Sequence, residues 1–372
     1  MSIINVPIKY ESDYHSISKA GEWISEIGTT VLIIAGKKAY AAVKSKLEKG
    51  LVDYHIDWTL TTFAGYPTVK KAKDYVAQAK LFGADVIVGI GGGSVLDIAK
   101  FVAQEAGLPV VTIPTVATTC AAWSALSIIY KEDGSQDVYE HLEQSPALII
   151  ADKHILRKAP IHYLHAGIAD SVAKYYEVVS DYSEHKNNFE LRLQIKVCDL
   201  LREFLEQDYI ASYRKYGSVL PKETIDNAID SIILLAGLTG SIQGDVPYGG
   251  IAHHFYNQST KLLITNRRLH GEVVLFGLAV QWALEGVSNQ YIKTRLQGFK
   301  VLGQPITLDD LGIINDKDKK VYTLAKLIKV SKGDYSSAVQ PLTTGTIIDA
   351  IFLVDELGRQ VYSDSVFEKL AV

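Results

Sequence analysis

Short runs of β-branched and apolar residues alternate with segments of helical periodicity over the first 150 residues. The apolar runs predict strands at Thr30–Ala35, Val52–Leu60, Asp85–Gly89, Val110–Ile113 and Ala147–Ala151. Apolar residues at helical spacing predict helices at Tyr40–Leu47, Val69–Ala79 and Ser94–Ala103, with Ser94 as a cap and Gly83 and Gly107 as stops. Strands separated by helices of this length favour right-handed βαβ units and a parallel sheet.

A β-hairpin interrupts this alternation. Ala125–Tyr130 and Asp137–His141 are rich in strand-forming residues and flank Asp133-Gly134. Asp-Gly is a strong turn signal because both residues tolerate the left-handed backbone that a tight turn requires.

Strand signals nearly vanish after Pro160. Helical periodicity is carried by Ala166–Val179, Phe189–Leu205, Lys222–Leu238 and Gly271–Asn289. A chain of 372 residues also exceeds what one hydrophobic core usually supports. We therefore predict an α/β domain over residues 1–159 and an all-helical domain over residues 160–372.

Composition and charge exclude several classes of function. The net charge is −4, and no stripe of Lys and Arg with interleaved aromatic residues marks a nucleic-acid surface. The apolar stretches Ile232–Leu238 and Val273–Leu284 are too short to span a bilayer, and the first residues lack a signal-peptide pattern. Cys120 and Cys198 make no disulfide framework and fit a reducing compartment. We expect a cytoplasmic protein that binds neither nucleic acid nor membranes.

The run from Gly89 to Ser94, GIGGGS, lies between a predicted strand and a predicted helix. Without side chains its backbone could approach a ligand closely, and the N–H groups of the following helix suit a phosphate. The run matches neither the GxGxxG nor the GxxxxGK[ST] pattern, and glycines also simply join strand to helix. Both interpretations remain open on spacing alone.

Five sequence blocks together carry a more specific signal. In chain order they are GGGSVLDIAK (Gly91–Lys100), PTVATTCAAWSALSIIY (Pro114–Tyr130), GIADSVAKYYE (Gly167–Glu177), AHHFYN (Ala252–Asn257) and HGEVVLFG (His270–Gly277). They resemble the glycerol-dehydrogenase-like branch of the iron-containing (group III) alcohol dehydrogenases. TTCAAW with DSVAKYYE is similar to the hydroxycarboxylate dehydrogenase subgroup. The resemblance implies a dehydroquinate synthase-like fold, in which a Rossmann-like α/β cofactor domain precedes an all-α domain and the active site lies between them.

The resemblance also implies a metal site. Asp170, His253 and His270 match the residues that ligate one divalent metal in this family, while His254 is given no role. One carboxylate and two imidazoles suit zinc or ferrous iron and leave a coordination position for substrate. The implied reaction is hydride transfer between a substrate carbon and a nicotinamide cofactor, NAD(P)(H), with the metal polarising the substrate oxygen.

Cofactor contacts follow from the same match. Gly92, Gly93 and Ser94 would hold the pyrophosphate, and Asp97 belongs to the same block. Leu126 and Tyr130 also match cofactor contacts of the family, although both could instead be hairpin residues that pack on the sheet. The other positions that match cofactor contacts are Thr115, Thr118 and Ser124.

Two departures from the glycerol-dehydrogenase pattern concern the substrate. Glycerol dehydrogenases carry an Asp at the position of Cys120, and a thiol is a poor acceptor for a polyol hydroxyl. Lys174 shares a helix face with Asp170, so it could offer a cation to a substrate carboxylate, with Arg267 and Arg268 adding charge. The alternative is that all three cations are solvated surface charges.

Two further departures concern the cofactor and the pocket. NAD-preferring relatives place an acidic residue after the first strand, where this chain has Gly36-Lys37-Lys38. Loss of the carboxylate removes repulsion toward a 2′-phosphate, so we expect NADP(H) to be accepted and favoured. Tyr256 replaces a second His of many relatives, and we expect it to alter the pocket shape without loss of the metal.

The leading hypothesis is thus a metal-dependent NAD(P)-linked dehydrogenase acting on a small-molecule substrate, a 2-hydroxy or 2-oxo acid in preference to glycerol or another diol. The alternative is a dehydroquinate synthase-like carbon–oxygen lyase, which would need more phosphate-binding Lys and Arg residues than this chain offers. A cofactor-binding protein without catalysis is disfavoured by the complete Asp170, His253 and His270 set. Because members of the family often assemble, we also expect a homo-oligomer.

Overall fold

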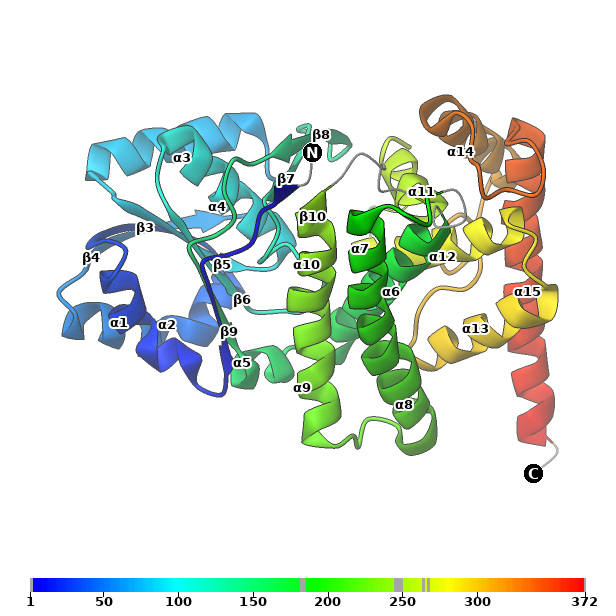
Figure 1. Ribbon diagram of the computed structural model, residues 1–372, viewed down its shortest axis with the longest axis horizontal. Helices are drawn as coiled ribbons and strands as arrows, with labels where there is room; N and C mark the ends of the chain where they lie inside the picture. Colours follow the sequence, from blue (N-terminus) through cyan, green and yellow to red (C-terminus); the bar gives the residue numbers. More distant parts are fainter. Residues whose placement is uncertain (1–2, 181–184, 244–249, 263–264, 266–267, 371–372) are drawn as a thin grey trace. The chain divides into compact units, whose positions relative to one another are not determined.

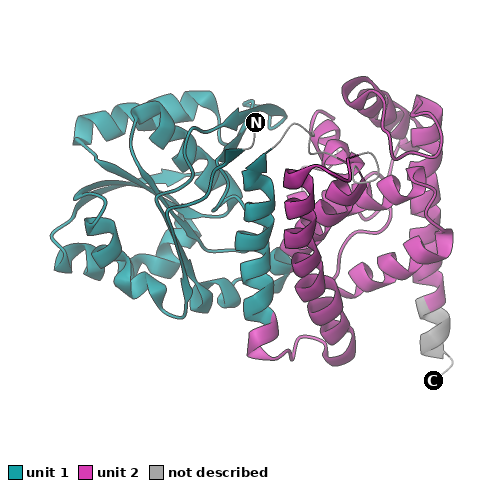
Figure 2. Cartoon of the chain, in the orientation of Figure 1, with its two compact units in different colours: residues 1–164, 225–243 teal, residues 165–224, 244–372 magenta. Residues whose placement is uncertain are grey.

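The computed structural model describes residues 3–180, 185–243, 250–262, 265 and 268–370 (Figure 1). They form two compact units (Figure 2). Unit 1 comprises residues 1–164 and 225–243, and unit 2 comprises residues 165–224 and 244–372.

Unit 1 is built on a six-stranded sheet in the order β2-β9-β6-β5-β3-β4, and every neighbouring pair is parallel. The predicted parallel sheet is therefore confirmed. The edge strand β2 was not predicted, because its sequence KYESD lacks an apolar run. The strands are β2 (Lys9–Asp13), β3 (Thr30–Gly36), β4 (Asp57–Phe63), β5 (Val86–Gly91), β6 (Val110–Pro114) and β9 (Leu148–Asp152).

Helices cover both faces of this sheet. Alternate residues of β3 point to opposite sides: Val31 and Ile33 join one hydrophobic core, while Leu32 and Ile34 join the other. This two-sided burial explains why the strands read as continuous apolar runs. The short helices and the connecting helices are η1 (Ser16–Lys19), α1 (Ala20–Ser25), α2 (Lys37–Asp53), α3 (Val69–Phe82), α4 (Gly93–Ala106) and α5 (Lys153–Lys158).

One predicted strand is displaced. The strand expected at Val52–Leu60 is β4, which begins at Asp57, because α2 continues to Asp53. Leu47 and Leu51 are fully buried at helical spacing, so the apolar residues before Tyr54 belong to the helix.

The predicted hairpin is confirmed. β7 (Leu126–Tyr130) and β8 (Gln136–His141) pair in antiparallel fashion. Asp133 stabilises the turn by accepting hydrogen bonds from the backbone N–H and the hydroxyl of Ser135 at 2.8 and 2.7 Å.

A later segment of the chain returns to unit 1. Residues 225–243 continue α9 (Lys222–Asp230) through η3 (Ser231–Leu235) and α10 (Ala236–Ser241) into β10 (Ile242–Gln243), which pairs with β1 (Ile3–Ile4).

Side chains of this segment bind others within unit 1. Asp230 accepts a hydrogen bond from Tyr10 at 2.8 Å and lies 2.8 Å from Lys153 Nζ, and Trp123 Nε1 donates to Ser241 at 3.1 Å. The division at residue 160 therefore differs from the observed units, whose first break follows residue 164 and which assign 225–243 to unit 1.

Unit 2 is helical, and no strand occurs in its described part. Nearly every residue of α12 from Gly271 to Trp282 is buried, so this helix lies at the centre of the unit. No helix in the described part of the chain has the length and apolar character that a membrane span requires. The helices are α6 (Ile161–Ser180), α7 (Phe189–Arg202), the π-helical η2 (Glu203–Ile210), α8 (Ala211–Tyr216), α11 (Ile251–Thr260), α12 (His270–Leu284), α13 (Asn289–Val301), α14 (Lys317–Lys332) and α15 (Thr344–Leu370).

Candidate functional site

Three helices of unit 2 bring Asp170, His253 and His270 together. Asp170 lies on α6, His253 in the first turn of α11, and His270 at the start of α12. Asp170 Oδ1 is 3.1 Å from His253 Nε2 and 2.9 Å from His270 Nε2. One ligand atom from each residue lies within 4.8 Å of the other two, so the three can reach a single ion.

Close packing of α6 and α12 sets this geometry. Gly271 follows His270, and a Cβ on this glycine would overlap the carbonyl oxygen of Ala166 and lie 3.0 Å from Asp170 Cβ. The absence of a side chain at residue 271 therefore lets the start of α12 approach Asp170 closely.

The two buried carboxylates near the cluster make it favourable for positive charge. Burial alone would raise the pKa of Asp170, which is only 2% exposed, but His270, His253 and Lys174 bring its pKa well below the usual value. Burial opposes charge on His253, yet Glu177 and Asp170 raise the pKa of this imidazole to about 9. A divalent ion held by these residues would likewise balance the negative charge of the carboxylates. One carboxylate and two imidazoles fit zinc or ferrous iron.

Glu177 was not predicted as a site residue. It is fully buried, and its carboxylate lies 2.5 Å from His253 Nδ1 and accepts the His253 backbone N–H at 2.9 Å. Burial acts against its ionisation, but His253 and Lys174 bring the pKa of Glu177 below the usual value. A signal was available in the sequence, because residues 170, 174 and 177 share one helix face.

Lys174 is buried on that face, between Asp170 and Glu177 in the sequence. Its charge contributes to lowering the pKa of both carboxylates. Lys174 thus has an electrostatic role inside the protein whether or not it also meets a substrate.

Of the other residues that the sequence analysis considered near the metal site, one contacts the cluster. Tyr256 packs edge-to-face on His270 with ring centroids 4.2 Å apart, so its ring forms part of the surroundings of that imidazole. His254 lies outside the three-residue cluster. Arg268 is exposed, and Arg267 lies outside the described residues.

In unit 1 the predicted cofactor residues gather at the carboxyl edge of the parallel sheet. β3 lies between β4 and β5. The strand that follows β3 in the chain, β4, is on one side of it, and the next strand, β5, is on the other side. Ligands of open α/β sheets bind at such a switch point, beyond the carboxyl ends of the strands. Gly36 ends β3 and Gly91 ends β5, with Lys37 exposed at the start of α2.

The glycine turn joins β5 to α4 at this edge. Gly92 is the residue that caps α4, so the prediction that Ser94 caps the helix is wrong; Ser94 is exposed in the first turn. A Cβ at Gly92 would lie 3.1 Å from Val116, and one at Gly93 would lie 3.4 Å from Thr119. The turn leaves open backbone at a helix N-terminus, which suits a pyrophosphate.

Asp97 and Lys100 form a buried pair beneath this turn. Lys100 Nζ lies 3.1 Å from Asp97 Oδ1, and it donates to the carbonyl oxygen of Ser124 at 3.0 Å and to that of Leu126. Lys100 therefore holds the segment that carries Ser124 and Leu126, and Asp97 balances the charge of this lysine.

The other predicted positions also follow the strands of unit 1. Thr115 is buried just after β6, where its N–H donates to Gly91 O at 3.0 Å. Thr118 and Cys120 lie partly exposed in the loop after β6. Tyr130 ends β7 and stacks on Tyr66 with centroids 5.6 Å apart.

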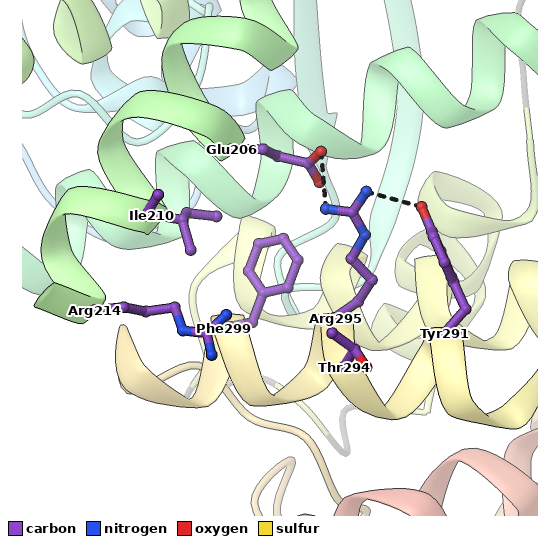
Figure 3. A pocket seen from close by; sticks show the side chains of 9 residues that line it. Glu206, Ile210, Arg214, Tyr291, Thr294, Arg295 and Phe299 are labelled. Atoms are coloured by element: carbon purple, nitrogen blue, oxygen red, sulfur yellow. Dashed lines mark hydrogen bonds and ion pairs between the residues drawn. The ribbon is translucent and has the colours of Figure 1, made fainter.

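A cavity of about 250 Å³ opens elsewhere in unit 2 (Figure 3). Glu206 at its wall lies 3.1 Å from Arg295, which also donates to Tyr291 Oη at 2.9 Å. Burial raises the pKa of Glu206, although Arg295 and Arg202 oppose the shift. None of the metal-cluster residues lines this cavity.

Comparisons with known proteins agree with these features. Residues 7–153 match the family model for iron-containing alcohol dehydrogenase. The chain is 32% identical over 287 residues to hydroxycarboxylate dehydrogenase A of Escherichia coli, covering 75% of this chain and 76% of that protein. It is 29% identical over 364 residues to glycolaldehyde reductase of Halobacterium salinarum, covering 97% and 99% of the two chains.

The fold has solved counterparts. The crystal structure of glycerol dehydrogenase from Schizosaccharomyces pombe superposes with a TM-score of 0.86 at 24% identity, covering 98% of this chain and 92% of that one. The α/β domain followed by a helical domain is thus the expected fold. Family membership implies a nicotinamide cofactor and a divalent metal. The chain belongs to the iron-containing alcohol dehydrogenase family and is a glycerol dehydrogenase-like oxidoreductase that acts on CH–OH groups.

Proposed function

We propose that the protein is a metal-dependent, NADP(H)-favouring dehydrogenase that interconverts small 2-hydroxy and 2-oxo acids. The observation that carries the proposal is the cluster of Asp170, His253 and His270 on three helices of one unit. Such a donor set serves a catalytic metal better than a structural one, because three protein ligands leave a position for substrate.

Each part of the chain has a defined task in this reaction. Asp170, His253 and His270 would hold the metal, which when bound supplies a Lewis acid for the substrate oxygen. Gly92, Gly93 and the first N–H groups of α4 would orient the cofactor through its pyrophosphate. The nicotinamide, when bound, would supply or accept the hydride, so no side-chain nucleophile is required.

The substrate class is inferred from Cys120 and Lys174. Cys120 offers a polyol a weaker acceptor than a carboxylate would, which disfavours glycerol. A buried ammonium at Lys174 can bind a substrate carboxylate strongly, since charged hydrogen bonds gain strength away from water. The match to hydroxycarboxylate dehydrogenase A supports this substrate class, while the match to glycolaldehyde reductase keeps neutral aldehydes as the comparison.

The cofactor preference is inferred from the end of β3. Lys37 and Lys38 are exposed directly after Gly36, beside the switch point of the sheet. An exposed lysine there can pair with a 2′-phosphate, and no carboxylate at Gly36 repels it.

The test is a spectrophotometric assay of zinc- or iron-loaded protein. We expect oxidation of NADPH at 340 nm with 2-oxo acids, and slower oxidation with dihydroxyacetone and glyceraldehyde. Absence of redox turnover with either cofactor and either metal would contradict the proposal and favour a lyase related to dehydroquinate synthase.

A further inference from the structure

The carboxylate of Glu177 contacts one residue in two ways. Oε1 accepts the backbone N–H of His253 at 2.9 Å, and Oε2 lies 2.5 Å from Nδ1 of the same residue. Glu177 is fully buried, so water does not compete for either contact. Two contacts from one carboxylate fix both the place of the His253 backbone and the rotation of its ring.

The start of α11 depends on side chains from other helices. Gly250 precedes the helix and has no side chain to cap it. The N–H groups of Ile251 and Ala252 donate to Gln281 Oε1 at 2.9 and 3.3 Å, while that of His253 donates to Glu177. Three N–H groups that a helix end leaves unpaired are therefore satisfied by α12 and α6.

The two capping side chains differ in one respect. On α11, Gln281 contacts the backbone through its amide oxygen, while its Nε2 donates to Tyr176 O on α6 and to Glu285. Glu177 contacts both the backbone and the ring of His253. An ionised carboxylate accepts hydrogen bonds and cannot donate them. The ring nitrogen that faces Glu177 must therefore carry the proton, which leaves the Nε2 lone pair for a metal.

We propose that Glu177 is a positioning residue of the metal centre, which holds His253 with Nδ1 protonated and Nε2 directed at the ion. This inference rests on the proposed ligation by Asp170, His253 and His270. Gln281 holds the backbone of α11 and also donates to Tyr176 O and Glu285, but it makes no hydrogen bond with the His253 ring.

Glu177→Gln tests the inference with a side chain of the same shape. Glu177 uses a separate oxygen for each contact, and an amide in the same position replaces one of these acceptors by an NH₂ donor, so one of the two contacts is lost. We expect zinc affinity, measured by competition with a chromophoric chelator, to fall about 10–100-fold. The d–d spectrum of the cobalt-substituted protein should change as the His253 ligand is reoriented.

Two control variants separate positioning from stability. Gln281→Met removes two backbone caps of α11 and the hydrogen bonds to Tyr176 O and Glu285, so it should lower the unfolding temperature. Because it leaves both Glu177 contacts in place, zinc affinity should stay within about threefold of wild type. Glu206→Gln removes another buried carboxylate of unit 2, one that pairs with Arg295, and should likewise leave zinc affinity unchanged.

Several outcomes would overturn the inference. Wild-type zinc affinity in Glu177→Gln would do so, as would an equal loss of affinity in Gln281→Met. Should Glu177→Gln fail to fold, Glu177→Asp decides, because its shorter carboxylate cannot keep both contacts and an unchanged affinity would count against positioning. Failure of the wild-type protein to bind one zinc ion would instead refute the metal site itself.

Discussion

His270 Nε2 lies 2.9 Å from Asp170 Oδ1, the same oxygen that lies 3.1 Å from His253 Nε2. Two imidazoles from separate helices thus converge on one oxygen of a buried carboxylate. The same atoms could bind a divalent ion once both Nε2 atoms are deprotonated, because a histidine ligates a metal in its neutral form.

Removal of one ligand should abolish metal binding. We expect His270→Ala to weaken zinc binding beyond the roughly 100-fold that losing an outer-shell partner costs. His254→Ala is the matched control, since His254 lies outside the cluster. Metal content after dialysis, read by atomic absorption, checks both. Full occupancy in His270→Ala would show that the ion binds elsewhere.

Zinc affinity should depend on pH through His253. The pKa of this imidazole is raised to about 9 in the metal-free protein, so the proton must leave before Nε2 can bind an ion. Affinity is therefore expected to rise with pH, on the order of 100-fold between pH 6.5 and 8.5. Calorimetry in buffers of different ionisation enthalpy should register the released proton. A pH-independent affinity would contradict this protonation state.

The same shift affects the stability of the metal-free protein. A raised histidine pKa stabilises the folded state fully below the unfolded value near 6.5, and this contribution is lost as the pH rises through about 9. Metal-free protein should accordingly lose stability over that range, and zinc should suppress the loss.

Lys174→Met should change substrate selectivity. If Lys174 binds a substrate carboxylate, kcat/KM for 2-oxo acids should fall about 10–100-fold more than kcat/KM for glyceraldehyde. The ratio of the two kcat/KM values reports carboxylate binding alone. Lys174 also lowers the pKa of Asp170 and Glu177, but the loss of that effect would change turnover of both substrates equally. An equal loss on both would assign Lys174 a purely internal role.

Lys37 and Lys38 should favour NADP(H). Replacement of both by Ala is expected to lower kcat/KM for NADPH about fivefold and to leave NADH nearly unchanged, since exposed charge pairs contribute about 1 kcal/mol or less. Steady-state kinetics with each cofactor checks this. A hundredfold preference of the wild type for NADH, roughly 2.7 kcal/mol, would rule out the cofactor proposal.

Gly271→Ala should disturb the packing that brings His270 to Asp170. The added methyl group overlaps Ala166 O, so we expect a loss of about 1–3 kcal/mol in the free energy of unfolding. Gly240→Ala is the control, because a Cβ there meets nothing within 4 Å and α10 should gain up to about 1 kcal/mol. Urea unfolding compares the two, and a Gly271→Ala protein as stable as wild type would show that the helices can move apart freely.

Much of the fold was predictable because burial leaves a periodic trace in the sequence. The central strands β3, β5 and β6 are apolar on both faces, and their helices show helical spacing. The polar edge strand β2 leaves no such trace. Helical periodicity in residues 225–243 predicts a helix with an apolar face, but it does not indicate which of the two cores that face packs against. The sequence therefore did not predict that this segment belongs to unit 1.

The candidate site was less accessible to sequence reasoning. His253 and His270 form no local metal motif, and their pairing came from family resemblance. Glu177 could have been found as the third polar residue on the Asp170 face of α6. Gln281 could not, because it reaches α11 through helix packing that no spacing rule encodes.

The most direct test joins the metal cluster to the reaction. Zinc-loaded wild-type protein and His253→Ala, prepared identically, are given NADPH and a series of 2-oxo acids, and absorbance at 340 nm is followed. We predict turnover by the wild type, and no turnover together with loss of bound zinc in the variant. Full activity in His253→Ala, or a wild type that binds zinc without oxidising NADPH or NADH, would contradict a metal-dependent dehydrogenase at this site.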